Sequence, residues 1–360
     1  MKKIILISCI SVLCFACRTE KATRSPEAIA LRNELQNIAK QGFMFGHHDD
    51  LMYGIGWWGD SARSDVQSVC GDYPAIFSFD VGDLEHGSEV NLDKVPFSKI
   101  RTEIIKHYER GGITTLSWHT DNPATGGDAW DISDTAVVSS ILPKGKNHEK
   151  FLGWLGNLAD FFNSITTADG TKIPIIFRPW HEHTGSWFWW GQNFCSTDEY
   201  KNLWKMTYDF MQQRDVNQLL YAYSPGQEPN SITEYLERYP ADEIIDILGT
   251  DVYQFNAADY KFNLDKMLNI ITLLGKEKNK PVALTETGFE AIPDSVWWTE
   301  TLLPLVEKYP ISYLVVWRNA YERSNHFYAP FPGQISANDF VIFYQNNKTV
   351  FLSEMKKNNK

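Results

Sequence analysis

The stretch PVALTETG, residues 281–288, joins a short apolar run to a glutamate, Glu286. A second stretch, IPIIFRPWHEH at residues 173–183, has the same order and brings Glu182 shortly after its apolar run. Short apolar runs rich in β-branched residues are typical of strands that are buried on both faces of a parallel sheet. We therefore expect both glutamates near the carboxyl ends of such strands.

Eight runs of this kind are spread along the chain, and helical stretches separate them. The expected strands are Phe43–His47, Ala75–Phe79, Ile113–Trp118, Ile173–Phe177, Leu219–Tyr223, Ile247–Val252, Val282–Thr285 and Tyr313–Trp317. The expected helices are Pro26–Lys40, Ser98–Arg110, Glu149–Ile165, Asp198–Gln213 with Thr197 as its cap, Leu264–Lys276 and Ser295–Lys308, with further helical stretches within 337–356.

Strands that alternate with helices indicate a parallel sheet, and eight parallel strands close into a barrel. An open doubly wound sheet is the alternative, but no GxGxxG motif follows the first run. We expect an α/β protein with a (β/α)8 TIM barrel as a single catalytic domain over residues 27–360. The longest irregular segments, 82–95, 121–146 and 318–336, follow strand ends, where such a barrel forms its substrate cleft.

The composition excludes some classes of partner. The chain has a net charge of -11, so it lacks the basic surface that nucleic acids require. Aromatic residues make up 14% of the chain and include 13 Trp. A neutral polymer therefore fits better than nucleic acid, an anionic membrane or an acidic polysaccharide.

The N-terminus resembles an export signal. Lys2 and Lys3 precede an apolar run that ends at Phe15, and Ala16 and Cys17 follow it. This pattern predicts a signal peptide over residues 1–16, lipidation of Cys17 and a polar tether over residues 17–26. An ordinary signal peptide without a lipid is the alternative. We expect an exported protein, either periplasmic or anchored to a membrane as a lipoprotein. No later segment approaches the roughly 20 apolar residues of a membrane span.

Cysteine and histidine patterns give no metal motif. Cys70 and Cys195 remain outside the signal, and the sequence leaves open whether they form a disulfide. His181-Glu182-His183 is not an HExxH motif, and no third ligand accompanies the two histidines, which we expect to point the same way. The segment 47–50, HHDD, fits better as a strand end with polar turn residues. We expect no metal and no cofactor.

Two carboxyl groups that face each other across a sugar are the working parts of most glycoside hydrolases. Burial of Glu182 among tryptophans would raise its pKa and keep it protonated as an acid. An ion pair between Glu182 and Arg178 is the alternative. Glu286 must stay ionised as a nucleophile, and Tyr253 at the end of the sixth strand can donate a hydrogen bond to it. Sequence does not fix the carboxyl separation, which is about 5–5.5 Å for retention and 6.5–9.5 Å for inversion.

Five long motifs carry a resemblance to a known family. They are RPWHEHTGSWFWWG (178–191), LSWHTDNPATGG (116–127), ALTETG (283–288), WRNAYERSNHFYAPFPG (317–333) and DFVIFYQNNKTVFLSEM (339–355). The chain closely resembles glycoside hydrolase family 26, whose best-known members are β-mannanases, from about Phe43 to Met355. This resemblance implies a (β/α)8 barrel and retention of configuration.

The resemblance also implies a role for individual residues. It implies that Glu182 is the acid/base, Glu286 the nucleophile and Tyr253 the residue that holds the nucleophile. The sugar-binding residues that it implies are His119 and Trp317 before the cut, Trp187 on the leaving-group side, and His181 beside the reactive sugar or the nucleophile. We expect weaker, rim contacts from Asn122, Arg318 and His326, together with Asp121 and Asn325. Asp80 and Asp83 are expected to have a structural or rim role, and Trp57 and Trp58 either line a subsite or pack under a loop.

The implied function is retaining hydrolysis of β-1,4-mannosidic bonds in β-mannan, galactomannan or manno-oligosaccharides by a monomer. Release of mannobiose from chain ends is an alternative within the same family. Activity on β-1,3-xylan or β-glucan ranks lower. A non-catalytic glycan-binding lipoprotein would be expected to lose the two glutamates, and both are present.

Overall fold

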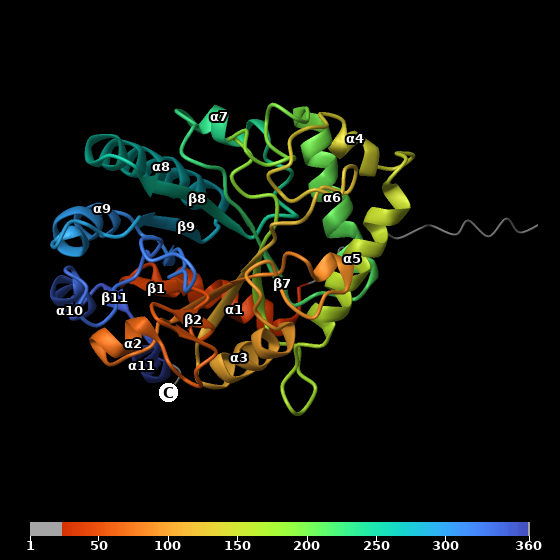
Figure 1. Ribbon diagram of the computed structural model, residues 1–360. Helices are drawn as coiled ribbons and strands as arrows, with labels where there is room; N and C mark the ends of the chain where they lie inside the picture. The colour runs from red at the N-terminus through yellow and green to blue at the C-terminus, as the bar shows by residue number, and fades with distance from the viewer. Residues whose placement is uncertain (1–23, 359–360) are drawn as a thin grey trace, which may run out of the picture.

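A closed barrel of eight parallel strands forms the centre of the computed structural model, which describes residues 24–358 (Figure 1). Its strands are β1 (Phe43–His48), β4 (Ile76–Asp80), β5 (Ile113–Ser117), β6 (Ile175–Arg178), β7 (Leu219–Tyr223), β8 (Ile247–Gln254), β9 (Val282–Phe289) and β10 (Tyr313–Val316). Each strand pairs with the next along the chain, and β10 pairs back with β1 to close the barrel. The predicted (β/α)8 TIM barrel is confirmed.

Helices surround the strands, as Figure 1 shows. They are α1 (Pro26–Ile38), α2 (Asp65–Cys70), η1 (Leu84–His86), α3 (Phe97–Glu109), α4 (Val137–Ile141), α5 (His148–Asn163), α6 (Thr197–Gln213), α7 (Ile232–Glu237), α8 (Ala257–Lys278), η2 (Trp298–Leu302), α9 (Leu303–Val306), α10 (Ala337–Tyr344) and α11 (Leu352–Asn358). A two-residue strand pair, β2 (Tyr53–Gly54) and β3 (Trp57–Trp58), follows β1.

Several helix predictions differ from the structure in detail, and α8, for example, begins at Ala257 and not at Leu264. The cap of α6 is Ser196 instead of Thr197, because Ser196 and Glu199 form a capping box that satisfies two backbone N–H groups. The C-terminal segment is not one helix. The short strand β11 (Thr349–Val350) separates α10 from α11 and pairs with the start of β1.

The barrel interior is filled by alternate residues of the strands, as a period of two requires. Met44, Ile76 and Ile176 lie in this inner cluster, and Leu31 and Leu35 of α1 join it. Full burial of such a side chain contributes about 1.5–3 kcal/mol. Helix α1 therefore packs against the amino-terminal end of the barrel and leaves the carboxyl-terminal end open for the site.

The residues before α1 belong to the folded domain. Arg24 pairs with Asp246 at 2.8 Å, the backbone N–H of Ser25 donates to Asn217 O, and the Ser25 hydroxyl caps α1. Residues 24–26, which the sequence assigned to the tether, are thus held in place. The predicted signal peptide and Cys17 lie outside the described residues.

Two further observations concern the cysteines and the helices of the described residues. Cys70 and Cys195 are both free thiols, which answers the question that the sequence left open. Within residues 24–358, none of the helices has the length and apolar character needed to cross a membrane.

Candidate active site

A β-bulge on β9 aims Glu286 into the barrel mouth. Thr250 of β8 pairs with Leu284, but the next residue, Asp251, pairs with Glu286, so Thr285 is an extra residue in the ladder. Bulges redirect side chains and are frequent beside active sites. The bulge brings Glu286 and Asp251 opposite each other, and both side chains are buried.

Donors from two other strands hold the carboxylate of Glu286. Arg178 of β6 donates from Nη2 to Glu286 Oε1, and Tyr253 of β8 donates to Glu286 Oε2 at 2.8 Å. Hydrogen bonds of this kind stabilise the charged form of a carboxyl group. This arrangement suits a nucleophile, and it differs from the alternative considered above, because Arg178 does not pair with Glu182.

Asp251 shares the same guanidinium. Arg178 Nη1 donates to Asp251 Oδ2 at 2.8 Å, and the hydroxyls of Ser224 and Thr285 also donate to this carboxyl group. Burial is the main reason that the pKa of Asp251 rises to about 7, and the charge of Glu286 adds to the rise. Two carboxyl groups and one guanidinium therefore form a single buried cluster.

The turn after β6 positions Glu182. Trp180 and Glu182 have φ angles of 55° and 51°, in the left-handed region that residues other than glycine rarely adopt. The Glu182 N–H donates to Ser224 O at 2.8 Å, which fixes the turn against β7. Backbone strain of this kind is concentrated at functional sites.

Trp187 covers the carboxyl group of Glu182. Its indole Nε1 donates to Glu182 Oε2 at 2.8 Å, although the ring itself is 40% exposed. A Cβ atom at position 185 would lie 2.2 Å from this ring, so Gly185 is required for the ring to take this position. The pKa of Glu182 is well above its ordinary value, mainly through burial and then through repulsion by Asp251 and Glu286. Glu182 is therefore suited to be a proton donor.

Both glutamates line one cavity of about 410 Å³. The other lining residues are His119, Trp130, Trp187, Phe188, Tyr253, Gln254, Phe255, Phe289, Glu290, Trp317, His326 and Tyr328. A second cavity of about 280 Å³ is lined by Gly226, Gln227, Glu228 and Asp251, and it shares Glu182, Trp187, Tyr253 and Phe255 with the first. The shared residues indicate one continuous cleft across the scissile position.

The comparisons with known proteins agree with this geometry. The sequence model of "Glycosyl hydrolase family 26" matches residues 20–343. The chain belongs to glycosyl hydrolase family 26. The resemblance seen in the sequence motifs is thereby confirmed.

Two relatives illustrate the similarity of this family 26 chain to characterised proteins. It is 34% identical to a mannan endo-1,4-β-mannosidase of Bifidobacterium adolescentis over 91% of its own length, but it spans only 35% of that relative. It is 26% identical to a mannan endo-1,4-β-mannosidase of Bacillus subtilis, covering 80% of this chain and 76% of the relative.

Solved structures extend the comparison. A family 26 β-mannanase from Bacteroides ovatus is 57% identical, with a TM-score of 0.91 and coverage of 92% of this chain and 96% of the other. A modular endo-β-1,4-mannanase from Cellulomonas fimi is 30% identical with a TM-score of 0.84, covering 93% and 77% of the two chains.

His119 and His181, two of the predicted sugar-binding residues, contact each other in this family 26 site. His181 Nε2 lies 3.1 Å from His119 Nε2, and His119 Nδ1 lies 2.7 Å from Asp80 Oδ2. His183 does not accompany His181 but packs between Tyr200 and Tyr223. The expectation that His181 and His183 point the same way is therefore wrong, because residues 181–183 form a turn and not a strand end.

Trp317 lies directly after β10 and lines the first cavity. The ring of His48 stacks on it, with ring centroids 4.0 Å apart and an interplanar angle of 24°. A flat aromatic surface that is supported from one side is suited to stack on a sugar ring. The position of Trp317 fits the predicted floor of the cleft.

The expected rim residues divide into two groups. His326 lines the cavity and pairs with Glu290 at 2.7 Å. Asn122 is fully buried and accepts hydrogen bonds from the N–H groups of Ala124 and Thr125, so it shapes its own loop instead of reaching the cleft. Arg318 is outside both cavity linings.

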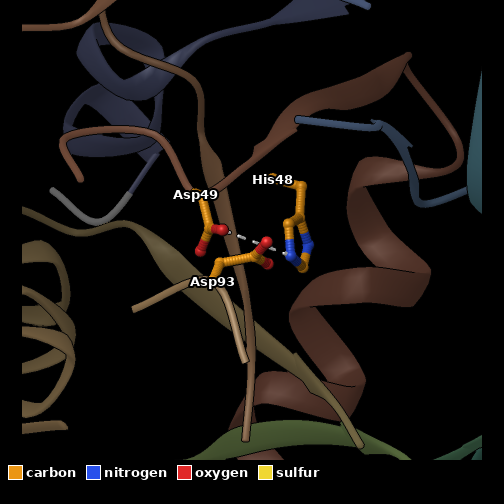
Figure 2. A group of neighbouring side chains, drawn as sticks. All are labelled: His48, Asp49 and Asp93. Carbon is orange, nitrogen blue, oxygen red and sulfur yellow. Dashed lines mark ion pairs between the residues drawn. The ribbon is translucent and has the colours of Figure 1, made fainter. Parts of the chain in front are cut away.

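Arg318 belongs to a polar cluster that includes His48 and Asp49 of the segment 47–50. His48, Asp49 and Asp93 have ligand atoms within 4.8 Å of one another, and Figure 2 shows the two carboxyl groups beside the His48 ring. Arg318 pairs with Asp93 at 3.2 Å, and Tyr53 donates to Asp49. The guanidinium thus supplies the positive charge that the two acids need, and we read the cluster as an ion-pair network.

Several lining residues escaped the sequence argument. Trp130, Phe188 and Tyr328 lie in or beside long loops, where no periodicity indicates which side chains face the cleft. Arg178 was considered only as a partner of Glu182, and Asp251 was not singled out. A signal for Asp251 existed, because it precedes Tyr253 by two residues on the same strand and so faces the same side.

Proposed function

We propose that this chain is an endo-acting, retaining β-mannanase that hydrolyses β-1,4-mannosidic bonds in mannan, galactomannan and manno-oligosaccharides. One observation carries the proposal: in a single cleft, one glutamate is held by a cation and a phenol, and the other is kept neutral by burial and repulsion. That asymmetry is what an acid and a nucleophile require. Family membership and the names of the relatives support the substrate.

The mechanism has two steps. Glu286 attacks the anomeric carbon while Glu182 protonates the departing glycosidic oxygen, and a mannosyl ester forms. Glu182, now ionised, removes a proton from water, and the water releases the sugar with its original configuration. Arg178 and Tyr253 hold the carboxylate of Glu286 during attack and receive it again when the ester is cleaved.

We infer the two sides of the substrate from the residues that line the two cavities. The sugar before the cut lies over Trp317, close to His119, because these residues line the cavity that contains Glu286. The leaving-group sugar lies beyond Trp187, where Gln227, Glu228 and Phe255 line the second cavity. Tryptophan and phenylalanine offer apolar faces to sugar rings, and Gln227 and Glu228 offer hydrogen bonds to hydroxyls.

The product profile on mannohexaose tests the cutting mode. An endo-acting enzyme releases a ladder of oligosaccharides from the start of the reaction. Almost exclusive early release of mannobiose would support the end-directed alternative instead. No hydrolysis of mannohexaose or galactomannan, measured as reducing ends, would refute the proposed activity.

We further propose export as a lipoprotein that carries its lipid on Cys17, and a monomeric state. The support for the lipoprotein is the N-terminal sequence pattern alone. Metabolic labelling with a radioactive fatty acid should mark the natural chain and not a Cys17→Ala variant. Labelling of both forms, or of neither, would contradict the lipoprotein proposal. Light scattering of the purified chain tests the monomer.

A further inference from the structure

Three side chains at or just beyond the ends of successive strands form a hydrogen-bonded row that reaches the cleft at His119. Asp80 ends β4, His119 lies two residues beyond β5, and His181 lies three residues beyond β6. Asp80 Oδ2 is 2.7 Å from His119 Nδ1, and the two Nε2 atoms of His119 and His181 are 3.1 Å apart. All three side chains are buried.

Asp80 acts only as an acceptor in this row. Its Oδ1 accepts from the N–H groups of Gly82 at 2.7 Å and His119 at 3.1 Å, and its Oδ2 accepts from the Ser117 hydroxyl at 2.6 Å as well as from the imidazole. Burial works against the charge, but His119 and these donors hold the pKa of Asp80 below its ordinary value. Because an ionised carboxylate has no proton to give, Nδ1 of His119 must carry one.

The contact between the two Nε2 atoms needs one shared proton. If His119 carries it, His119 is an imidazolium, and the neutral ring of His181 then has its own proton on Nδ1. If His181 carries it, both rings are neutral, and Nδ1 of His181 is bare. The two states thus differ in one net proton and in the hydrogen-bonding character of Nδ1 of His181.

The charged groups around the row decide which ring can hold the extra proton. Burial opposes charge on His119, but Asp80 from β4 and Glu286 from β9 raise its pKa, and Arg178 from β6 counteracts them in part. For His181, burial lowers the pKa well below its ordinary value. The Arg178 cation adds to this effect, as would protonation of His119, of His48 from β1 or of His183 from the same turn. An extra proton on the pair therefore resides on His119 and not on His181.

We propose that Asp80, His119 and His181 form a proton relay in which the charge state of His119 sets whether Nδ1 of His181 donates or accepts a hydrogen bond. As the pH rises, Nδ1 of His181 loses its proton to solvent, and the shared proton moves from Nε2 of His119 to Nε2 of His181. Asp80 is a positioning residue, since it lines neither cavity but fixes His119 in the required tautomer.

The relay ends at an atom that is free to act on other groups. Among the described residues, Nδ1 of His181 is buried and has no hydrogen-bond partner. Both nitrogens of His119 are already engaged by Asp80 and His181. His181 lines neither cavity, whereas His119 lines the first, so the pair acts on a sugar in the cleft through the charge of His119, and this link to substrate rests on the proposed function.

Nitrogen-15 NMR of histidine-labelled protein tests the relay directly, because ring nitrogen shifts report both charge and tautomer. Between pH 5 and pH 9, His119 should change charge and His181 should change tautomer, with a common midpoint. Asp80→Asn should lower that midpoint by about one pH unit or more, since it removes the charge that stabilises the imidazolium. Ser117→Ala, which removes only a neutral donor from Asp80, is the matched control and should preserve both tautomers.

The outcomes separate the relay from a merely structural network. A single tautomer of His181 throughout the titration, or two separate midpoints, would overturn the proposal, and this measurement needs only the unmutated protein. An unchanged midpoint in Asp80→Asn would overturn the role of Asp80. In Asp80→Asn, the pH profile of kcat/KM on 4-nitrophenyl β-mannobioside should shift in the same direction as the NMR midpoint. An inactive protein with an intact NMR titration would contradict the proposed function and leave the relay standing.

Discussion

Asp251 and Glu286 lie opposite each other across the β8–β9 ladder and share the single guanidinium of Arg178. This pairing depends on the bulge at Thr285, without which the register would turn Glu286 to the other face. One cation between two carboxylates leaves the cluster short of positive charge. The negative charges of Asp251 and Glu286 therefore raise the pKa of Glu182 and help to keep Glu182 protonated.

Asp251→Asn should therefore move the alkaline limb of kcat/KM to lower pH. The substitution keeps the shape but removes a charge that raises the pKa of Glu182, so Glu182 loses its proton earlier as the pH rises. The pH–rate profile on 4-nitrophenyl β-mannobioside measures this shift. Ser224→Ala, which removes one hydroxyl from Asp251 and no charge, is the control. An unmoved alkaline limb in Asp251→Asn would contradict this electrostatic role.

Trp187→Phe should shift the same limb in the opposite direction. The indole N–H stabilises the ionised form of Glu182 and so lowers its pKa. Loss of that donor should leave Glu182 protonated to higher pH, while the missing ring surface raises KM for long substrates. Equal directions of shift in Trp187→Phe and Asp251→Asn would show that Glu182 does not govern this limb.

Tyr253→Phe should lower kcat/KM by roughly 10- to 100-fold. A hydrogen bond to a charged group contributes about 1.5–3 kcal/mol, and this phenol donates to the carboxylate of Glu286. Steady-state kinetics on mannotetraose measures the loss. Tyr260→Phe removes a buried phenol that bonds to Thr287 outside the cleft, so it controls for the general effect of losing a hydroxyl. Equal losses in the two variants would refute a specific role for Tyr253.

Removal of each glutamate should produce a different defect. Glu286→Ala should abolish turnover on every substrate, because no covalent intermediate can form. Glu182→Gln should reduce hydrolysis of natural mannan by about 100- to 10,000-fold, but it should spare the first step with a 2,4-dinitrophenyl leaving group, which needs no proton. Burst kinetics distinguishes the two. Full activity of Glu286→Ala would refute the nucleophile assignment.

Arg24→Ala should destabilise the fold without affecting the cleft. The side chain pairs with Asp246, donates to Ile244 O and lies over the ring of Tyr221, and both members of the ion pair are largely buried. Breaking a buried pair costs about 3–5 kcal/mol. Urea unfolding should show this loss, with kcat unchanged at 25 °C. An unchanged free energy of unfolding in Arg24→Ala would show that Arg24 belongs to the tether and not to the folded domain.

The sequence predicted the barrel well because its strands carry a local signal. Each of the eight expected strands overlaps a strand of the structure, since a strand buried on both faces must be apolar along its length. The predicted ends of the strands were less accurate. β8 and β9 continue to Gln254 and Phe289, beyond the apolar runs, because paired backbone and the bulge sustain them where polar site residues interrupt the pattern.

The site was predictable only where a residue's neighbours in sequence are its neighbours in space. Glu182 and Trp187 meet within one turn, and the motif predicted both. The contacts of Arg178 with Asp251 and Glu286, and of Asp80 with His119, join residues on different strands. These contacts depend on the closure of the barrel and on a bulge, and neither can be predicted from the local composition of the sequence. Asn122 is the opposite case. We expected it at the rim of the cleft, but its side chain accepts a hydrogen bond from the backbone of its own loop.

The packing of α1 against the amino-terminal end of the barrel fixes where the chain emerges. Ser25 is bound to Asn217, just before β7 begins, so Arg24, the first described residue, lies at the pole opposite the substrate opening. If Cys17 carries a lipid, the enzyme would stand on the membrane by its sealed base, with its mouth toward the surrounding medium. Insoluble or long polysaccharide could then be engaged from outside without the bilayer obstructing its approach.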